Sequence, residues 1–418
     1  MTNLQLKRLA ARRLPPDSTR RLCLLTGARQ VGKTSLARAT YPGLRYVNLD
    51  AVEDRRALRE VPTARWGEVV GPAVLDEAQK EPSLFEKVKH AYDAGAVRFS
   101  LLLGSAQILM LQRVRETLAG RAFVYELWPL TLAEIAAAGA EPRTPLLVRL
   151  LEGTGPFSEA LADEPAVLLG DEEAAREAAL RHLGQWGGMP ELVHLGDADR
   201  RQWLRSYHDT YLQRDLADLA RLSDLAPFTT FQKLAALRTG GVLSYADLAR
   251  DAGVSPSTAR SYLEYLKLSY QAFLLPPFRE NLTSSVVKAP KLYWADLGIA
   301  RHLAGFAGPL SGALFETLVV GEAVKLVRTL GLEVEAFYYR TRSGMEVDAL
   351  LSSPRGVLAL EAKARPSWVA SDLGAMKAVA GALGTRFRGG IVVTSGGKLE
   401  RASSDDRFWS VPAHRLFS

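Results

Sequence analysis

The feature that constrains this chain most is an eight-residue segment, GARQVGKT, that fits the phosphate-binding loop pattern G-x-x-x-x-G-K-[ST]. The apolar run Leu22–Leu25 precedes it and predicts a buried strand, and helix-forming residues 35–39 follow. Glycines let backbone N–H groups point at phosphate oxygens, and the start of the next helix adds partial positive charge. The sequence therefore predicts an ATP site. Its expected residues are Gly27, Ala28, Arg29, Gln30, Val31, Gly32, Lys33, Thr34 and Ser35.

Two side chains of this loop have expected roles. Lys33 would reach the β- and γ-phosphates of ATP, and the Thr34 hydroxyl would hold Mg²⁺. The alternative is a glycine-rich turn that matches by accident, which average residue usage predicts in on the order of one per cent of chains this long. The strand before the loop and the helix after it make nucleotide binding the better interpretation.

Residues 72–77 (PAVLDE) are a short apolar run that ends in two carboxylates, the Walker B arrangement. Asp76 is expected to hold the Mg²⁺ shell, and Glu77 to polarise the attacking water. Such a run is a weak signal alone, because strands often end in surface acids, but it gains strength downstream of a phosphate loop. The apolar run 99–103 ends beside Ser105, the first candidate to orient the water, and Gln107, the second.

Composition sets bounds on the remaining possibilities. A length of 418 residues suggests about three domains, at ~150 residues each. The single cysteine, Cys23, excludes intrachain disulfides and multi-cysteine metal sites, and the histidines are scattered without ligand spacing. No apolar run reaches the ~18 residues of a membrane span, and the first eight residues lack an apolar signal core. We expect a cytoplasmic protein with no membrane partner.

The chain is basic overall. It has 53 Lys and Arg against 46 Asp and Glu, a net charge of +7 and a pI near 9.4. This balance is compatible with a polyanionic partner such as DNA. The excess is spread along the chain without a basic run, so a solvated basic surface is the alternative.

The pattern of residues changes along the chain. Residues 1–135 alternate strands and helices, which predicts an α/β unit with a mostly parallel sheet and ligands at the carboxyl ends of its strands. Residues 136–240 are helical and would form a lid over the nucleotide domain. The turn Gly187–Glu191 inside this region is most simply a connector.

Residues 241–280 predict a helix-turn-helix or winged-helix unit. Ser255 as N-cap and Pro256 at the first helical position are a good start signal for the second helix. Residues early in that helix would face the DNA major groove. A packing or subunit-contact module is the alternative. The candidate DNA-binding residues are Ser257, Thr258, Arg260 and Ser261.

Residues 281–418 return to mixed α/β, with an apolar helix from Phe315, a hairpin over 338–350 and a strand over 357–363. Glu361 and Lys363 lie two apart on that strand and face the same side. With Asp348 on the neighbouring strand they could bind a divalent ion, and Lys363 could activate a hydroxide for phosphodiester cleavage. Charges on the solvent face of a strand are the alternative, although the apolar run before Glu361 favours a central strand.

Six segments together resemble one known family: the predicted AAA-type ATPases of bacteria and archaea, in the wider AAA+ superfamily. These proteins carry a C-terminal domain similar to PD-(D/E)XK nucleases. The resemblance implies an α/β ATPase core, a helical lid with a winged helix, and a restriction-endonuclease-like terminal fold. The segments are 27–34, 75–82, 118–121, 187–191, 291–298 and 344–348.

The resemblance also implies site residues. It assigns ATP chemistry to Lys33, Thr34, Asp76 and Glu77, and a nuclease-like site to Glu316, Asp348, Glu361 and Lys363. Proteins of this superfamily usually complete their active site with an arginine from an adjacent subunit. Arg121 is the candidate for this role, with Arg113 and Arg115 after it, and Arg214 is a candidate γ-phosphate sensor.

Three functional hypotheses remain open. The leading one is a Mg²⁺-dependent ATPase that forms a closed homo-oligomer and uses ATP-driven motion to act on DNA. The second is an ATP-gated, metal-dependent nuclease. The third is a regulatory switch that acts on a protein partner.

Overall fold

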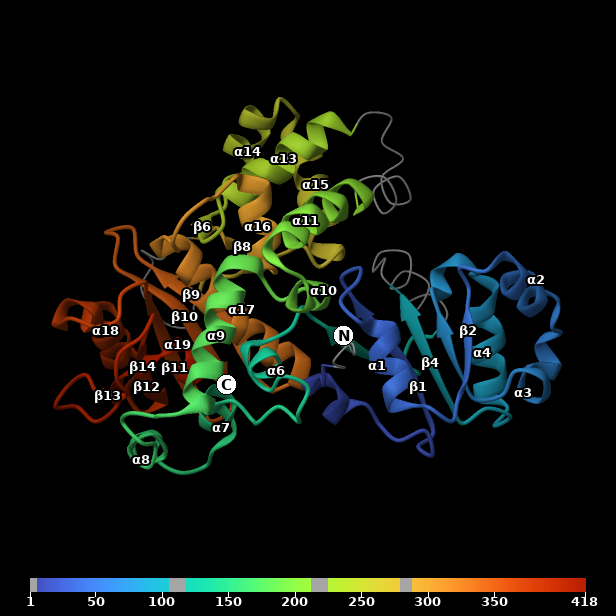
Figure 1. The fold of residues 1–418 in the computed structure, drawn as a ribbon, viewed down its shortest axis with the longest axis horizontal. Coiled ribbons are helices and arrows are strands. Elements are labelled where there is room, and N and C mark those ends of the chain that lie inside the picture. The colour runs from blue at the N-terminus through green and yellow to red at the C-terminus, as the bar shows by residue number, and fades with distance from the viewer. Residues whose placement is uncertain (1–5, 105–117, 212–224, 279–287) are drawn as a thin grey trace.

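The computed structural model describes residues 6–104, 118–211, 225–278 and 288–418. Its N-terminal unit is a five-stranded parallel sheet of order β2-β3-β4-β1-β5, which confirms the α/β prediction (Figure 1). Strand β4 lies between β1 and β3, so its carboxyl end lies between the strand that precedes the predicted phosphate loop and the strand that carries the Asp-Glu pair. The strands are β1 Arg21–Gly27, β2 Arg45–Asn48, β3 Ala73–Asp76, β4 Phe99–Gly104 and β5 Ala122–Leu127.

Helices cover both faces of this sheet. Cys23 and Leu25 of β1 enter the core that contains α1, whereas Leu22 and Leu24 enter the core that contains α4. Burial on both faces explains why the central strands are apolar at every position. The helices of the unit are η1 Leu9–Arg13, α1 Lys33–Thr40, α2 Val52–Glu60, η2 Thr63–Arg65, α3 Trp66–Val69, η3 Ala78–Lys80 and α4 Ser83–Asp93.

The following region is helical, as predicted, but residues 157–166 within it lie against the C-terminal sheet. Gly389 of that sheet lies so close to Phe157 that a Cβ would be 2.4 Å from the ring. Leu399 N also donates to Ala166 O, at 3.2 Å. The helices are α6 Leu132–Ala136, α7 Leu146–Glu152, α8 Phe157–Ala162, α9 Asp171–Trp186, α10 Pro190–His194, α11 Asp197–Tyr211 and α13 Ala226–Leu237.

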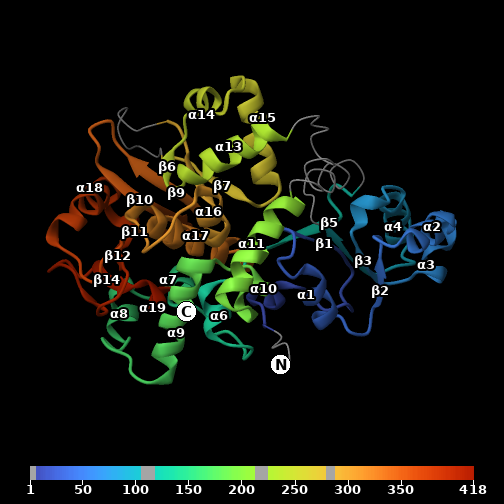
Figure 2. The same cartoon turned by 45° about the horizontal axis from the view of Figure 1, so that its top comes forward.

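The predicted helix-turn-helix pair is present as α14 Tyr245–Ala252 and α15 Pro256–Leu268, near the top of Figure 2. Ser255 accepts from Thr258 N at 3.1 Å, and Gly253 makes the left-handed turn between the helices. A three-stranded sheet of order β6-β8-β7 packs with the pair, so the unit extends past residue 280. Its other elements are β6 Gly241–Val242, β7 Ala272–Leu275, β8 Lys291–Trp294 and α16 Leu297–Ala304.

The C-terminal unit is a mixed six-stranded sheet of order β13-β14-β12-β11-β10-β9. The predicted hairpin and the central position of the strand with Glu361 are both confirmed. Leu358 and Leu360 face the core with α17, while Val357 and Ala359 face the core with α18. The elements are α17 Gly312–Leu330, β9 Glu335–Arg340, β10 Glu346–Ser353, β11 Gly356–Lys363, η5 Ala370–Leu373, α18 Gly374–Leu383, η6 Gly384–Arg386, β12 Phe387–Thr394, β13 Glu400–Arg401, β14 Phe408–Pro412 and α19 Ala413–Leu416.

Helix α17 joins the units. Buried Glu322 accepts from Leu132 N at 2.7 Å, at the first residue of α6, and pairs with Lys325, which donates to Leu130 O at 3.2 Å. One apolar core extends from the N-terminal sheet along α17 to the C-terminal sheet. Among the described residues, no helix is long and apolar enough to cross a bilayer.

Candidate functional site

The phosphate loop turns sharply between β1 and α1. Gly27 lies so close to β5 that a Cβ there would be 2.1 Å from Leu127 O, and Gly32 has a φ of +95°. Both positions therefore require glycine. Gln30 also has a positive φ, of 57°, which is rare for a residue with a side chain. This backbone places the N-terminus of α1 at the end of the loop.

Lys33 is the first residue of α1 and is buried. Its Nζ donates to two carbonyls of its own loop, Gly27 O at 3.0 Å and Ala28 O at 2.7 Å. The ammonium therefore lies over the loop, where a phosphate-loop lysine meets the β- and γ-phosphates.

Thr34 and Asp76 lie in direct contact. Thr34 Oγ1 donates to Asp76 Oδ2 at 2.6 Å, and the Tyr46 hydroxyl donates to the same oxygen at 2.8 Å. Glu77 N donates to Asp76 Oδ1 at 2.9 Å. Burial and the hydrogen bond to Asp76 raise the pKa of Tyr46 above its ordinary value. The two residues predicted to hold Mg²⁺ thus face one point, and Tyr46 is a further residue that the motifs did not reveal.

Glu77 has an unusual backbone. Its φ of 53° and ψ of 41° are left-handed, a conformation that costs an ordinary residue about 1–3 kcal/mol and often marks functional sites. The Gln79 amide donates to Glu77 Oε2 and fixes the carboxylate. Gln79 follows Glu77 by two residues, and no motif predicted this contact.

Arg8 connects the loop to the rest of the unit and was not predicted. Its Nη1 donates to Val31 O at 2.7 Å, its Nη2 to Trp128 O at 2.5 Å, and its Nε lies 3.2 Å from Glu134 Oε1. The side chain is buried. Arg8 thereby ties the loop to the segment after β5.

A pocket of about 1040 Å³ opens beside the start of α1. Its lining residues include Gly32 and Ser35 at the start of α1, and Lys7 and Arg8 near the N-terminus. Residues of α10 also line it, so the turn predicted to be a connector contributes to this pocket. Gly188 of that turn accepts from Leu130 N at 2.7 Å and donates to Asp296 Oδ2 at 2.7 Å. The α10 residues are Pro190, Glu191 and His194.

Several predicted catalytic residues lie outside the described residues. These are Ser105, Gln107, Arg113, Arg115 and Arg214.

Arg121 is described. It precedes β5 at the amino ends of the strands, the edge opposite the phosphate loop, and its Nε lies 2.8 Å from Asp93 Oδ1. It therefore does not reach the phosphate loop of its own chain.

The candidate DNA-binding face is on the surface of α15. Ser257, Arg260 and Ser261 are exposed, and Thr258 is half-buried. The Arg260 guanidinium lies 5.1 Å from the Tyr245 ring centroid. The face is accessible, and its contact with DNA stays a prediction.

In the C-terminal unit, Asp348 and Glu361 occupy neighbouring strands. Since Ala349 pairs with Leu360, the register places the two carboxylates opposite each other. Asp348 Oδ2 accepts from Ala362 N at 2.8 Å, and Lys363 Nζ lies 2.7 Å from Glu361 Oε1. Burial, with Glu316 and Glu361 nearby, raises the pKa of Asp348 well above its ordinary value.

Glu316 reaches this cluster from α17. It lies beside Glu346 and Lys291, neither of which was predicted as a site residue. One oxygen each from Glu316, Glu346 and Asp348 lie within 4.8 Å of one another. Lys291 lies among them, 2.6 Å from Glu316 Oε1. Burial disfavours its ammonium, but the carboxylates outweigh this and raise the pKa of Lys291. The one sequence signal for Lys291 was its place as a charged residue in the otherwise apolar strand β8.

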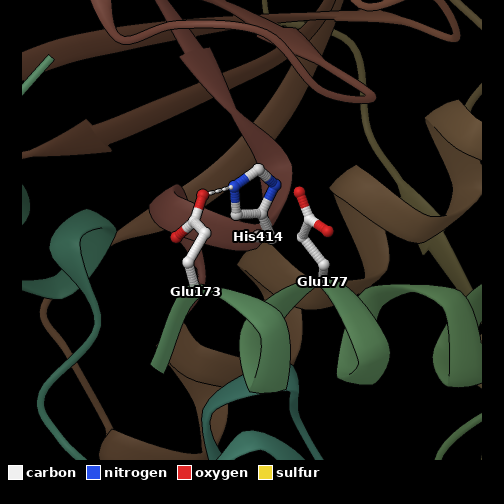
Figure 3. Close-up of side chains that lie close together, drawn as sticks. All are labelled: Glu173, Glu177 and His414. Atoms are coloured by element: carbon white, nitrogen blue, oxygen red, sulfur yellow. Dashed lines mark hydrogen bonds and ion pairs between the residues drawn. The ribbon is translucent and has the colours of Figure 1, made fainter. Parts of the chain in front are cut away.

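A second group of metal-ligand type lies between α9 and α19. Figure 3 shows the His414 ring between the carboxylates of Glu173 and Glu177. His414 Nε2 lies 2.6 Å from Glu173 Oε1, which ties the last helix to α9. His414 lies far from Glu173 and Glu177 in the sequence, so spacing could not reveal the group.

Three family profiles match successive parts of the chain. One described as an AAA domain matches residues 19–136. Two described as domains of unknown function match residues 177–310 and 311–416. Residues 19–136 therefore form an AAA domain with an ATPase fold.

Similar proteins were found among curated sequences and solved structures. Uncharacterized proteins of Mycobacterium tuberculosis and Mycobacterium bovis are each 28% identical over 336 residues, which cover 78% of this chain and 66% of each relative. The chain thus spans just under two thirds of their length. A Walker-type ATPase of Pyrococcus abyssi has 18% identity and a TM-score of 0.45, covering 72% of this chain and 96% of that one. The Orc1 protein of Aeropyrum pernix, solved with DNA, has 16% identity and a TM-score of 0.29, covering 71% and 88%.

Proposed function

We propose that this AAA domain binds Mg²⁺-ATP at the phosphate loop and hydrolyses it. The observation that carries the proposal is the contact of Thr34 with Asp76, because it joins the loop to the carboxylate strand at one point. Two hydroxyls and a carboxylate at that point suit Mg²⁺, a hard cation that prefers oxygen ligands.

The chain's own residues divide the work. Lys33 exchanges its two carbonyl partners for phosphate oxygens, and the N–H groups of the loop and of α1 bind the remaining oxygens. Thr34 and Asp76 would hold Mg²⁺, which supplies charge neutralisation when it is bound with the nucleotide. Glu77, fixed by Gln79, accepts the proton of the attacking water. The pocket of about 1040 Å³ is large enough for the nucleoside.

Substitution of Glu77 tests hydrolysis separately from binding. Glu77→Gln should retain ATP binding and lower turnover by about 10²–10⁴-fold, because the general base is lost. Glu86→Gln, an exposed site on α4, is the control and should be unaffected. Normal turnover in Glu77→Gln would remove this residue from the base role.

We further propose that the α15 face binds DNA and that ATP turnover is coupled to this binding. The exposed face and the basic net charge of the chain support it. DNA binding should weaken steeply with salt, and Arg260→Ala should weaken it while Arg181→Ala on α9 should not. Salt-independent binding, or none, would favour a switch that acts on a protein partner.

We also propose self-association into a ring in which Arg121 serves the neighbouring subunit. Its position at the edge of the sheet opposite its own loop supports a role in trans. Arg121→Ala and Glu77→Gln should each be inactive alone, but mixing the two should restore turnover at interfaces that combine intact Glu77 with intact Arg121. Mixtures that stay inactive would exclude this arrangement.

Metal-dependent DNA cleavage at the C-terminal cluster is a weaker candidate. Asp348, Glu361 and Lys363 favour it by lying together. However, the cluster as arranged does not fit a divalent ion, because the Lys291 ammonium already lies among the carboxylates. Wild-type protein should therefore leave supercoiled DNA intact with Mg²⁺ or Mn²⁺. Nicking that Asp348→Ala abolishes would restore the nuclease interpretation.

A further inference from the structure

Lys291 has the position that a metal ion would take in the C-terminal cluster. Its Nζ lies 2.6 Å from Glu316 Oε1 and 3.9 Å from Asp348 Oδ1, and it is ion-paired with Glu346 Oε1. These are the three carboxylates whose oxygens converge within 4.8 Å. A single ammonium thus contacts all members of the group.

The surroundings hold this ammonium in place. The Lys291 side chain is only 2% exposed. The Tyr293 hydroxyl donates to Glu316 Oε1 at 2.6 Å, and the Tyr338 ring centroid lies 5.6 Å from Nζ. The ammonium is therefore shielded from solvent, and an ion pair with such a buried partner is costly to break.

The charges of the cluster nearly balance without a metal. Four carboxyl groups, among them Asp348 with its raised pKa, face three cations, since Arg340 lies 3.2 Å from Glu346 Oε2 and Lys363 lies 2.7 Å from Glu361 Oε1. A divalent ion added to this set would leave excess positive charge in a buried site, which is unfavourable. Glu361 Oε2 is buried and has no hydrogen-bond partner among the described residues. The carboxylates are Glu316, Glu346, Asp348 and Glu361, and the cations are Lys291, Arg340 and Lys363.

The cation and the carboxylates belong to different units. Lys291 pairs with Val242 and Leu275 in the small sheet beside the helix-turn-helix. The carboxylates are on α17, β10 and β11 of the C-terminal unit. The ion pairs of Lys291 therefore connect the two units.

We propose that Lys291 is the resident cation of this acidic cluster, where it replaces a divalent metal ion and fastens strand β8 to the C-terminal unit. Lys291 and a divalent ion are then alternative occupants of one position. The carboxylates accept a metal only when the ammonium is removed, by substitution or by withdrawal of β8.

The test compares Mn²⁺ binding in nucleotide-free, full-length protein, with Asp76→Asn present throughout to silence the ATP site. Electron paramagnetic resonance of free Mn²⁺ should show no binding to this parent and a single bound ion in Lys291→Met. Adding Asp348→Asn to Lys291→Met should abolish that binding. Lys325→Met is the matched control, because it removes another buried lysine that is paired with a glutamate on α17. It should bind no Mn²⁺.

Thermal unfolding gives an independent measure. Lys291→Met should lower Tm relative to the parent, and Mn²⁺ should raise it again, whereas the parent and Lys325→Met should not respond to Mn²⁺. Glu346→Gln added to Lys291→Met should recover part of the loss without metal. A folded Lys291→Met protein that binds no Mn²⁺ would overturn the proposal. If Lys291→Met fails to fold, the proposal is tested on the Asp76→Asn parent alone. Mn²⁺ binding to the parent that Asp348→Asn removes would overturn the proposal, and a parent without such binding would support it.

Discussion

The nucleotide site and the C-terminal cluster both combine lysine with carboxylates, yet they arrange these charges differently. At the nucleotide site, Lys33 donates to loop carbonyls and Asp76 accepts from hydroxyls. In the cluster, buried Lys291 is ion-paired with two partly exposed carboxylates. Neutral partners are readily exchanged for phosphate or Mg²⁺, whereas buried ion pairs are costly to separate. This difference agrees with the two proposals, that the first site takes ligands and that the second holds the structure together.

The largest effect is expected from Lys33→Ala. The lysine would make charge-assisted contacts with two phosphates, each contributing about 1.5–3 kcal/mol. The Kd for Mg²⁺-ATP should therefore rise by about 10²–10⁴-fold with little change in Tm, as measured by calorimetric titration. A large loss of stability with unchanged affinity would mean that Lys33, like Lys291, is structural.

Lys291→Met should show the opposite behaviour. Removal of one partner from a buried ion pair typically costs about 3–5 kcal/mol. We expect a loss of this size in urea unfolding and unchanged ATP affinity in the folded protein. Lys377→Met on α18, outside the cluster, should cost much less. Equal stabilities for these two variants would erase the contrast between the sites.

Arg8→Ala tests whether the nucleotide site also depends on a buried ion pair. Arg8 loses contacts with Val31 O, Trp128 O and Glu134, so we expect a cost of about 2–4 kcal/mol. Arg12→Ala, the partly exposed neighbour that pairs with Glu141, should cost less than about 1 kcal/mol. A free energy of unfolding that changes equally in both variants would remove Arg8 from its role as an anchor of the loop.

The smallest effect concerns pH. Burial raises the folded-state pKa of Asp348, so the folded protein retains a proton that the unfolded chain releases above pH 4. This group's contribution to stability therefore falls as pH rises from about 4 through the folded-state pKa. The decline should be less steep in Asp348→Asn. The free energy of unfolding of this variant, relative to wild type, should be about 1 kcal/mol higher at pH 8 than at pH 5. Parallel urea-unfolding profiles for variant and wild type would contradict this.

The sequence predicted those parts of the molecule that depend on residues close together in the chain. The phosphate loop and the acidic pair at the end of β3 are contiguous motifs, and the predicted hairpin over 338–350 joins two strands that follow each other in the sequence. Lys291 and Arg8 could not be predicted in the same way, because their partners lie on distant elements and only packing brings them together. Packing also places α8 and the loop after it against the C-terminal sheet, in a region where the helical character of the sequence suggested a lid.

One measurement tests most directly the claim that metal chemistry belongs to the nucleotide site. Mn²⁺ binding to wild-type protein would be followed by electron paramagnetic resonance with and without a non-hydrolysable ATP analogue. We expect a single bound Mn²⁺ only when the nucleotide is present, and none in Lys33→Ala. Mn²⁺ that binds without nucleotide, persists in Lys33→Ala and disappears in Asp348→Asn would contradict the account.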